Sequence, residues 1–145
     1  MPKQRLPKHI LGLFPNLNSL NHYVTSPADV RYNCAAWVAN DTTKWWDGFQ
    51  YWPREAARSD ELSAARAAFA SIGFVPCPDG RNEGGFERIA IYEKDGRWKH
   101  VARQLTDGQW TSKLGQAQDI CHKTVAALFS DAYGQVVAFM KRPRT

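Results

Sequence analysis

One cysteine and one histidine occupy positions in this sequence that suit nucleophilic catalysis. Cys34 lies in a short apolar segment that predicts the opening of a buried helix over about residues 30–40. A thiol on the first turn of a helix is close to the partial positive charge there, which stabilises its thiolate. His100 stands near the start of residues 99–105, an alternating segment that predicts a strand. An imidazole facing the thiol would complete the nucleophile and base of a cysteine hydrolase.

Both residues also have a purely structural interpretation, which the sequence leaves open. A free cysteine is a common small core residue that packs as an apolar side chain. His100 could equally be a half-buried strand residue that hydrogen bonds to a backbone carbonyl. The catalytic interpretation makes one geometric demand: the strand face carrying His100 must look toward the helix carrying Cys34.

A third group that orients the imidazole would come from the next strand, and the turn between the strands limits the choice. With a two-residue turn, Lys113 faces Ala102. With a three-residue turn and a bulge at Gly108, Ser112 faces Ala102 and lies beside His100 on the same surface. The Thr-Asp-Gly turn suits the bulged form, because glycine takes the left-handed position there. Ser112 is therefore our first candidate and Lys113 the second.

Further residues near Cys34 could bind substrate or a developing oxyanion. The backbone N–H of Cys34 and the amide of Asn33 are candidate oxyanion donors, although Asn33 could equally be the N-cap of the helix. Tyr32 or Gln50 could close the site. A tryptophan-rich loop could form a cleft wall, or its rings could simply be core packing. The candidate binding residues are Tyr32, Asn33, Lys113, Trp45 and Trp46.

A second polar cluster, DICH at residues 119–122, precedes a helix expected over about residues 122–130. Asp119 or His122 could cap that helix. Cys121 and His122 are adjacent and therefore poorly placed to ligate one metal together. We expect no metal and no cofactor.

Composition and charge favour an ordinary globular protein. The 145 residues are 43% hydrophobic and 23% charged, with a net charge of +5 that is concentrated partly at the two ends of the chain. Three scattered cysteines do not make a disulfide framework, which fits a reducing compartment. No signal peptide or membrane span is apparent, so we expect a cytoplasmic protein, with export only by a route that reads no such signal.

The order of predicted elements indicates an α+β fold. Residues 1–29 contain four prolines and predict an extended N-terminal arm, and residues 30–145 predict a single domain. A helix is expected over about residues 59–72, with Gly73 as its stop. Strands are expected at residues 87–93, 97–105, 109–114 and 134–140. We therefore expect N-terminal helices packed on an antiparallel sheet of about four strands.

A cysteine at a helix start, then a histidine in a meander, then a strand with a polar residue resembles the papain-like cysteine hydrolases. Their smaller bacterial members, the NlpC-type amidases and endopeptidases, are the closest architectural match, over about residues 32–114. The resemblance implies a papain-like core with Cys34 as nucleophile and His100 as base. That family's third residue is usually His, Asn, Asp, Gln or Glu. This chain has Ser112 or Lys113 there, so a dyad or an inactive fold stays open.

The sequence also resembles an uncharacterised family of small bacterial proteins. The similar segments are YNCAAW (residues 32–37), HVARQ (100–104), WTSKLG (110–115), DICH (119–122) and YG (133–134). This second resemblance covers most of the chain and implies no activity.

These observations predict a bacterial cysteine amidase or peptidase that cleaves a peptide or isopeptide bond through a Cys34 acyl-enzyme. The alternative is a catalytically inactive module of the same fold that binds a partner protein or, less favoured, nucleic acid. Its binding surface would be the basic chain ends, Arg103, Lys113 and exposed aromatic residues. No membrane partner is expected.

Overall fold

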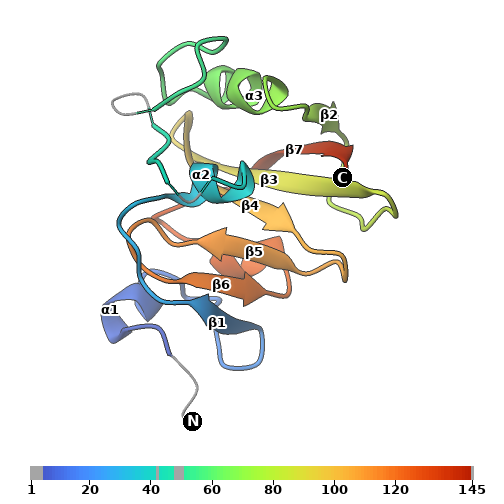
Figure 1. Cartoon of the computed structure of the whole chain (residues 1–145). Helices are drawn as coiled ribbons and strands as arrows, with labels where there is room; N and C mark the ends of the chain where they lie inside the picture. Colours follow the sequence, from blue (N-terminus) through green and yellow to red (C-terminus); the bar gives the residue numbers. More distant parts are fainter. Residues whose placement is uncertain (1–4, 42, 48–50, 145) are drawn as a thin grey trace.

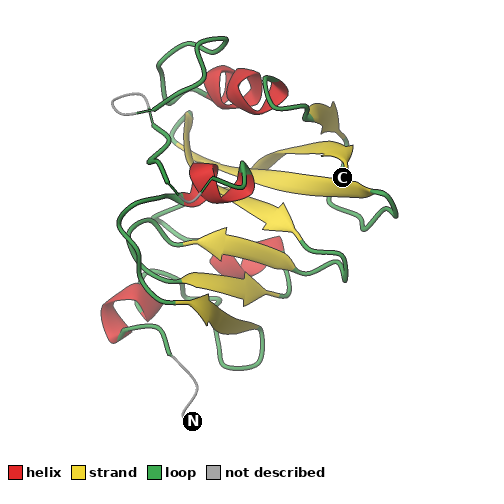
Figure 2. Ribbon diagram, in the orientation of Figure 1, coloured by secondary structure: helices red, strands yellow, loops and turns green. Residues whose placement is uncertain are grey.

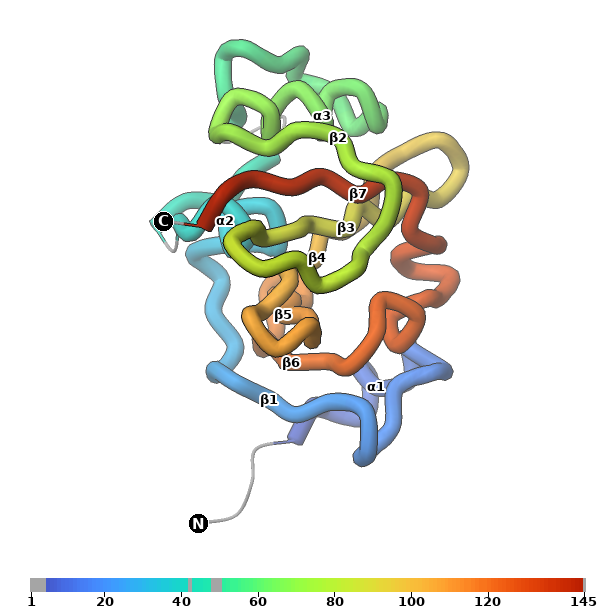
Figure 3. Tube along the Cα trace, turned by 90° about the vertical axis from the view of Figure 1, so that its right-hand side faces the viewer, coloured from blue at the N-terminus to red at the C-terminus, as the bar shows by residue number. Residues whose placement is uncertain are grey.

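A single seven-stranded antiparallel sheet forms the centre of the protein, in the order β1-β6-β5-β4-β3-β7-β2 (Figure 1). The computed structural model describes residues 5–41, 43–47 and 51–144. The strands are β1 His22–Ser26, β2 Val75–Cys77, β3 Phe86–Lys94, β4 Arg97–Gln104, β5 Trp110–Lys113, β6 Asp119–His122 and β7 Gln135–Pro143. The helices are α1 Lys8–Leu11, α2 Cys34–Val38, α3 Leu62–Ala70 and the 3₁₀ helix η1 Val125–Leu128. Figure 3 shows the strands following one another in this order.

The expected fold class, helices packed on a sheet of about four strands, is wrong. Sheet, not helix, dominates the chain, and the helices are few and short (Figure 2). The four expected strands are present as β3, β4, β5 and β7, and three more, β1, β2 and β6, were not anticipated. β1 lies inside the segment expected to be an extended arm and pairs with β6. β2 contains a proline, which an edge strand tolerates because one side of its backbone needs no partner.

The helix expected over residues 122–130 is also absent. Residues 119–122 form β6, which pairs with both β1 and β5, and only four residues of 3₁₀ helix follow. Two neighbouring strands satisfy the backbone of β6 on both sides, and this tertiary pairing outweighs the local signal for a helix start. The helix expected over residues 59–72 is confirmed as α3, and the chain leaves it through Gly73 at a φ of 102°.

The two faces of the sheet are covered by different helices. On one face, α2 and α3 pack on Ile89, Ile91 and Val101. On the other face, residues of the α1 region and η1 pack on Ala90, Tyr92 and Ala102. Figure 1 shows α2 in front of the sheet and η1 behind it. Neighbouring residues of β4 therefore face different layers of the core.

β4 and β5 pair over only two residue pairs, Arg103 with Thr111 and Gln104 with Trp110. The turn between them is the bulged one, with Gly108 at a φ of 90°. Its register, continued by one residue, sets Ser112 opposite Ala102, so the register predicted for the bulged turn is confirmed. Beyond this short ladder the two strands are unpaired, and the candidate site lies at that opening.

No helix in the described ranges, 5–41, 43–47 and 51–144, is long and apolar enough to cross a membrane.

Gly134 gives a direct test of the packing next to this site. A Cβ added there would lie 1.9 Å from the carbonyl oxygen of Glu93, and the φ of 71° disfavours any other residue. We expect Gly134→Ala to lower the melting temperature far more than Gly96→Ala. Gly96 has a similar φ, of 79°, but open space around it, so its change costs only about 1 kcal/mol. Equal losses in thermal unfolding of the two variants would contradict the close approach at Gly134.

Candidate functional site

Cys34 is the first residue of α2 and lines a cleft of about 520 Å³. The residue is 6% exposed. Trp45, Trp98 and Tyr133 form the aromatic part of the lining. Its charged part holds both signs, since Arg97 is paired there with Asp60. The cleft thus places a thiol in a surface hollow whose walls are partly aromatic and partly charged.

The catalytic interpretation requires the ring of His100 to lie on the sheet face that α2 covers, and it does not. α2 packs on the face of the sheet that carries Val101, whereas the ring of His100 lies on the other face, against Tyr92 and Tyr133. The cysteine and the histidine nevertheless flank one peptide unit. The backbone N–H of Val101, which belongs to the His100–Val101 peptide, hydrogen bonds to the sulfur of Cys34. The two side chains approach this peptide from opposite faces, where β4 and β5 are no longer paired.

Tyr133 connects the two groups. Its ring stacks on His100 with 4.2 Å between centroids and 5° between planes. It also lines the cleft together with Cys34, and the nearby Cys34 contributes to the raised pKa of Tyr133, behind the larger effect of burial. The cleft is therefore lined by the thiol and by the tyrosine that stacks on the buried His100.

A chain of hydrogen bonds leads from His100 into the protein interior. Its Nε2 lies 2.9 Å from Oγ of Ser112, which lies 2.8 Å from Nε2 of His122. Nδ1 of His122 lies 2.8 Å from the carbonyl oxygen of Thr124. His100, Ser112 and His122 are completely buried. The other ring nitrogen of His100, Nδ1, is buried and has no hydrogen-bond partner among the described residues.

Burial keeps the Cys34 thiol and the His100 imidazole neutral. It raises the pKa of the Cys34 thiol to about 11, and the backbone N–H groups of Val101 and Ala35 offset only part of that shift. It also lowers the pKa of His100 well below 6.5, and His122 lowers it further. The expected stabilised thiolate is therefore wrong for the resting protein, since removal from water outweighs the favourable backbone groups.

Asn33 acts as the N-cap of α2, the alternative left open by the sequence. Its Oδ1 accepts hydrogen bonds from the backbone N–H groups of Ala36 and Trp46, both at 3.1 Å. Its Nδ2 donates to the carbonyl oxygen of Trp46 at 2.7 Å. The side chain is thus occupied in joining the tryptophan loop to the helix start, although it also borders the cleft.

Lys113 and Tyr32 lie away from the cleft. Nζ of the fully buried Lys113 donates to the carbonyl oxygens of Asp29, Gly115 and Ala117, each at 2.6 Å. These three bonds use all the donors of an ammonium group, and burial lowers the pKa of Lys113. Nζ also lies 5.0 Å from the ring centre of Tyr32. Both residues hold the segment before α2 onto the sheet.

The tryptophan loop divides between the cleft and the core. Trp45 lines the cleft. Trp46 is 4% exposed and donates its Nε1–H to Asp41, so it belongs to the core. Trp52 stacks on Trp98 at 5.7 Å, behind the cleft wall. Gln50, a candidate for closing the site, lies outside the described residues.

Two residues of the site, His122 and Tyr133, were not assigned to it from the sequence. DICH does not alternate polar and apolar residues, so its pattern gives no strand signal; once it forms β6, the pleat places His122 and Ile120 on one face. The pairing of Ser112 with Ile120 then brings His122 toward Ser112. No local signal in the sequence places Tyr133 on His100.

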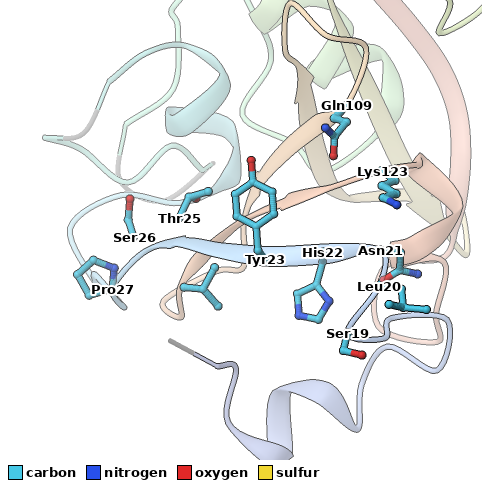
Figure 4. Close-up of a pocket in the computed structure, with 11 residues that line it drawn as sticks. Ser19, Leu20, Asn21, His22, Tyr23, Thr25, Ser26, Pro27, Gln109 and Lys123 are labelled. Atoms are coloured by element: carbon cyan, nitrogen blue, oxygen red, sulfur yellow. The ribbon is translucent and has the colours of Figure 1, made fainter. Parts of the chain in front are cut away.

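A larger hollow, of about 680 Å³, follows the edge strand β1 (Figure 4). His22, Tyr23, Gln109 and Lys123 contribute to its lining. Nδ1 of His22 is bonded to the carbonyl oxygen of Asn18 at 2.6 Å. Among the described residues that line it there is no cysteine, and none of them also lines the Cys34 cleft, so this hollow is not the better candidate for covalent chemistry.

Comparison with known protein families finds a family model that matches this chain. A family model described as a domain of unknown function, DUF7689, matches residues 23–141. The chain belongs to the DUF7689 family. No curated protein and no solved structure matches it. The DUF7689 match runs from β1 into β7 and includes Cys34, His100, Ser112 and His122. Within the described part of this DUF7689 chain, no group of three or more His, Cys, Asp or Glu side chains is arranged to hold a metal ion.

The buried histidines predict an acid-sensitive fold. Burial lowers the pKa of His122 from 6.5 to about 4, so between these values the unfolded chain binds a proton that the folded chain does not. This contribution to stability is complete above pH 6.5 and is lost as the pH falls toward 4, at up to about 1.4 kcal/mol per pH unit. We expect urea unfolding between pH 6.5 and 4 to show a shallower pH dependence in His122→Gln than in the wild type. His9→Gln, at an exposed position, is the control, and equal slopes in all three proteins would contradict the buried neutral state of His122.

Proposed function

We propose that this DUF7689 protein is a cysteine hydrolase that cleaves an amide bond through an acyl-enzyme on Cys34. One observation carries the proposal. A cleft-lining thiol and a buried imidazole flank the same peptide unit, and that imidazole keeps one ring nitrogen without a partner among the described residues while Ser112 holds the other. A histidine that serves only the core would be expected to have both nitrogens bonded.

Each group has a defined part in the reaction. The Cys34 thiol and Nδ1 of His100 form no hydrogen bond in the resting structure, so the reaction requires them to come into contact. Nδ1 then takes the thiol proton as Sγ attacks the carbonyl carbon of the amide. The imidazolium then gives this proton to the leaving amine, and the C–N bond breaks. A water molecule, deprotonated by the same nitrogen, attacks the thioester. The acid leaves and the thiol is restored.

Neutral resting groups make this a general-base mechanism. A thiol with a pKa of about 11 is protonated at neutral pH, and His100 is uncharged because its pKa lies well below 6.5. Proton transfer therefore accompanies nucleophilic attack and does not precede it. The ion pair that activates many cysteine nucleophiles is absent from the resting site.

Tyr133 is the best-placed side chain for the oxyanion. It borders the cleft beside Cys34 and is held by its stack on His100. Burial, together with the nearby Cys34, raises its pKa, so the hydroxyl stays protonated and can donate. The backbone N–H of Cys34 supplies the second donor, as such sites require at least one fixed donor near the developing charge.

The substrate is a peptide or an isopeptide linkage. The cleft has aromatic walls from Trp45 and Trp98 for apolar parts of the substrate, and Lys99 at its rim can meet carboxylate groups. This combination suits a chain of amide bonds better than a small charged metabolite. No cofactor takes part in the steps above.

The rival nucleic-acid module has weaker support. Its cations at the C-terminal end are paired with carboxylates: Lys141 with Glu83 at 3.0 Å, and Arg142 and Arg144 with Glu87 at 2.6 and 3.6 Å. Of the cations near the N-terminus, Lys3 lies outside the described residues.

Removal of the nucleophile tests the proposal directly. We expect Cys34→Ala to fold normally and to lose hydrolysis of a mixed peptide library by at least about a thousandfold, as measured by mass spectrometry of released fragments. Cys77→Ala, which changes a half-buried cysteine far along the chain, should keep wild-type turnover. Hydrolysis that survives in Cys34→Ala, or a library that the wild-type protein leaves intact, would overturn the proposal.

The pH profile tests the assignment of the base. His100 must be neutral to accept the thiol proton, and its pKa is held well below 6.5. We therefore expect kcat/KM to stay level as the pH falls through 6.5 and to decline only at lower pH. An acid limb centred at 6.5 or above would assign the essential base to an exposed group instead of His100.

A further inference from the structure

The buried chain from His100 to Thr124 allows only one arrangement of protons. At its inner end, Nδ1 of His122 faces the carbonyl oxygen of Thr124 at 2.8 Å. A carbonyl oxygen can only accept, so Nδ1 must carry the hydrogen. Because His122 is neutral, its Nε2 then has none and can only accept.

The next two links follow from this one. Oγ of Ser112 lies 2.8 Å from the bare Nε2 of His122, so the serine donates its single hydrogen there. Toward His100, at 2.9 Å, the same oxygen can now only accept, so Nε2 of His100 carries a hydrogen. The neutral ring of His100 therefore has a bare Nδ1, the nitrogen that has no partner in the described part of the chain.

We infer that His122 is a positioning residue that sets the tautomer of His100 through Ser112, so that the free nitrogen of His100 is a base and not a donor. The inference deepens the proposed function and takes its catalytic meaning from it. A serine alone could not do this, because its hydroxyl can either donate to or accept from His100. His122 removes that freedom by taking the hydroxyl hydrogen.

No carboxylate performs this task among the described groups that contact the chain. Asp119, on the same strand as His122, accepts hydrogen bonds from Thr25 and Tyr32 on the other face of the sheet. Tyr92, from β3, and Tyr133 pack on the ring of His100. A charge in this completely buried position would be costly, and two neutral hydrogen bonds orient the ring without one.

Long-range ¹H–¹⁵N NMR of the four histidines tests the inference, because it distinguishes a protonated ring nitrogen from a bare one. In the wild type we expect hydrogen on Nε2 of His100 and on Nδ1 of His122. His122→Leu removes the acceptor, so the Ser112 hydroxyl can turn to donate to His100, and hydrogen should move to Nδ1 of His100. His122→Gln can offer an amide oxygen to Ser112 and should restore the wild-type pattern.

A second readout, alkylation of Cys34 by iodoacetamide at neutral pH, separates this inference from the proposed function. We expect at least a tenfold slower reaction in His122→Leu and in His100→Ala, with His122→Gln close to the wild type. If the histidines show the expected tautomers but Cys34 is alkylated equally slowly in all four proteins, the role of His122 is upheld and the proposed hydrolase activity is overturned.

Other results would contradict the inference about His122 itself. The inference about His122 is overturned if Nδ1 of His100 carries hydrogen in the wild type. It is also overturned if the tautomer of His100 is the same in His122→Leu as in the wild type. If His122→Leu does not fold, the inference is tested by the tautomers of the wild type and by the tautomer of His100 in Ser112→Ala, which breaks the hydrogen-bond chain at its middle.

Discussion

The unpaired stretch between β4 and β5 is the feature on which the rest of the site depends. A backbone N–H that loses its strand partner must find another acceptor, and for Val101 this acceptor is the sulfur of Cys34. A continuous ladder would have separated α2 from His100 by a closed layer of backbone. Because pairing ends after two residue pairs, groups from both faces of the sheet meet at one opening.

Removal from water governs the electrostatics around this opening. The thiol, the two histidines and Tyr133 are all held in their neutral forms. A buried cation nearby, Lys113, has three carbonyl partners and supports the segment before α2. The site therefore differs from a preformed ion pair: its reactivity depends on proton transfer during the reaction, and orientation of the imidazole matters more than its resting charge.

Local signals in the sequence predicted the meander well and the edges of the sheet poorly. Asp-Gly turns and strict alternation located β3, β4 and β5, and the bulge at Gly108 predicted the contact between Ser112 and His100. β1, β2 and β6 were missed because none of them is joined to a sheet partner by a short Asp-Gly turn, and each acquires its conformation from its neighbours. The same limit applies to the site. Cys34 and Ser112 were found from position and spacing, but Tyr133 reaches His100 only through tertiary packing, and His122 was hidden by the expectation of a helix.

The double role of Asn33 has a mechanical consequence. Its side-chain amide caps the start of α2 and also forms hydrogen bonds with the backbone of Trp46, next to the cleft-lining Trp45. The wall of the cleft and the thiol are thus linked by a single side chain. A ligand that displaces the wall must strain the same hydrogen bonds that hold the thiol in place, so occupancy of the cleft and alignment of the nucleophile are transmitted to each other through Asn33.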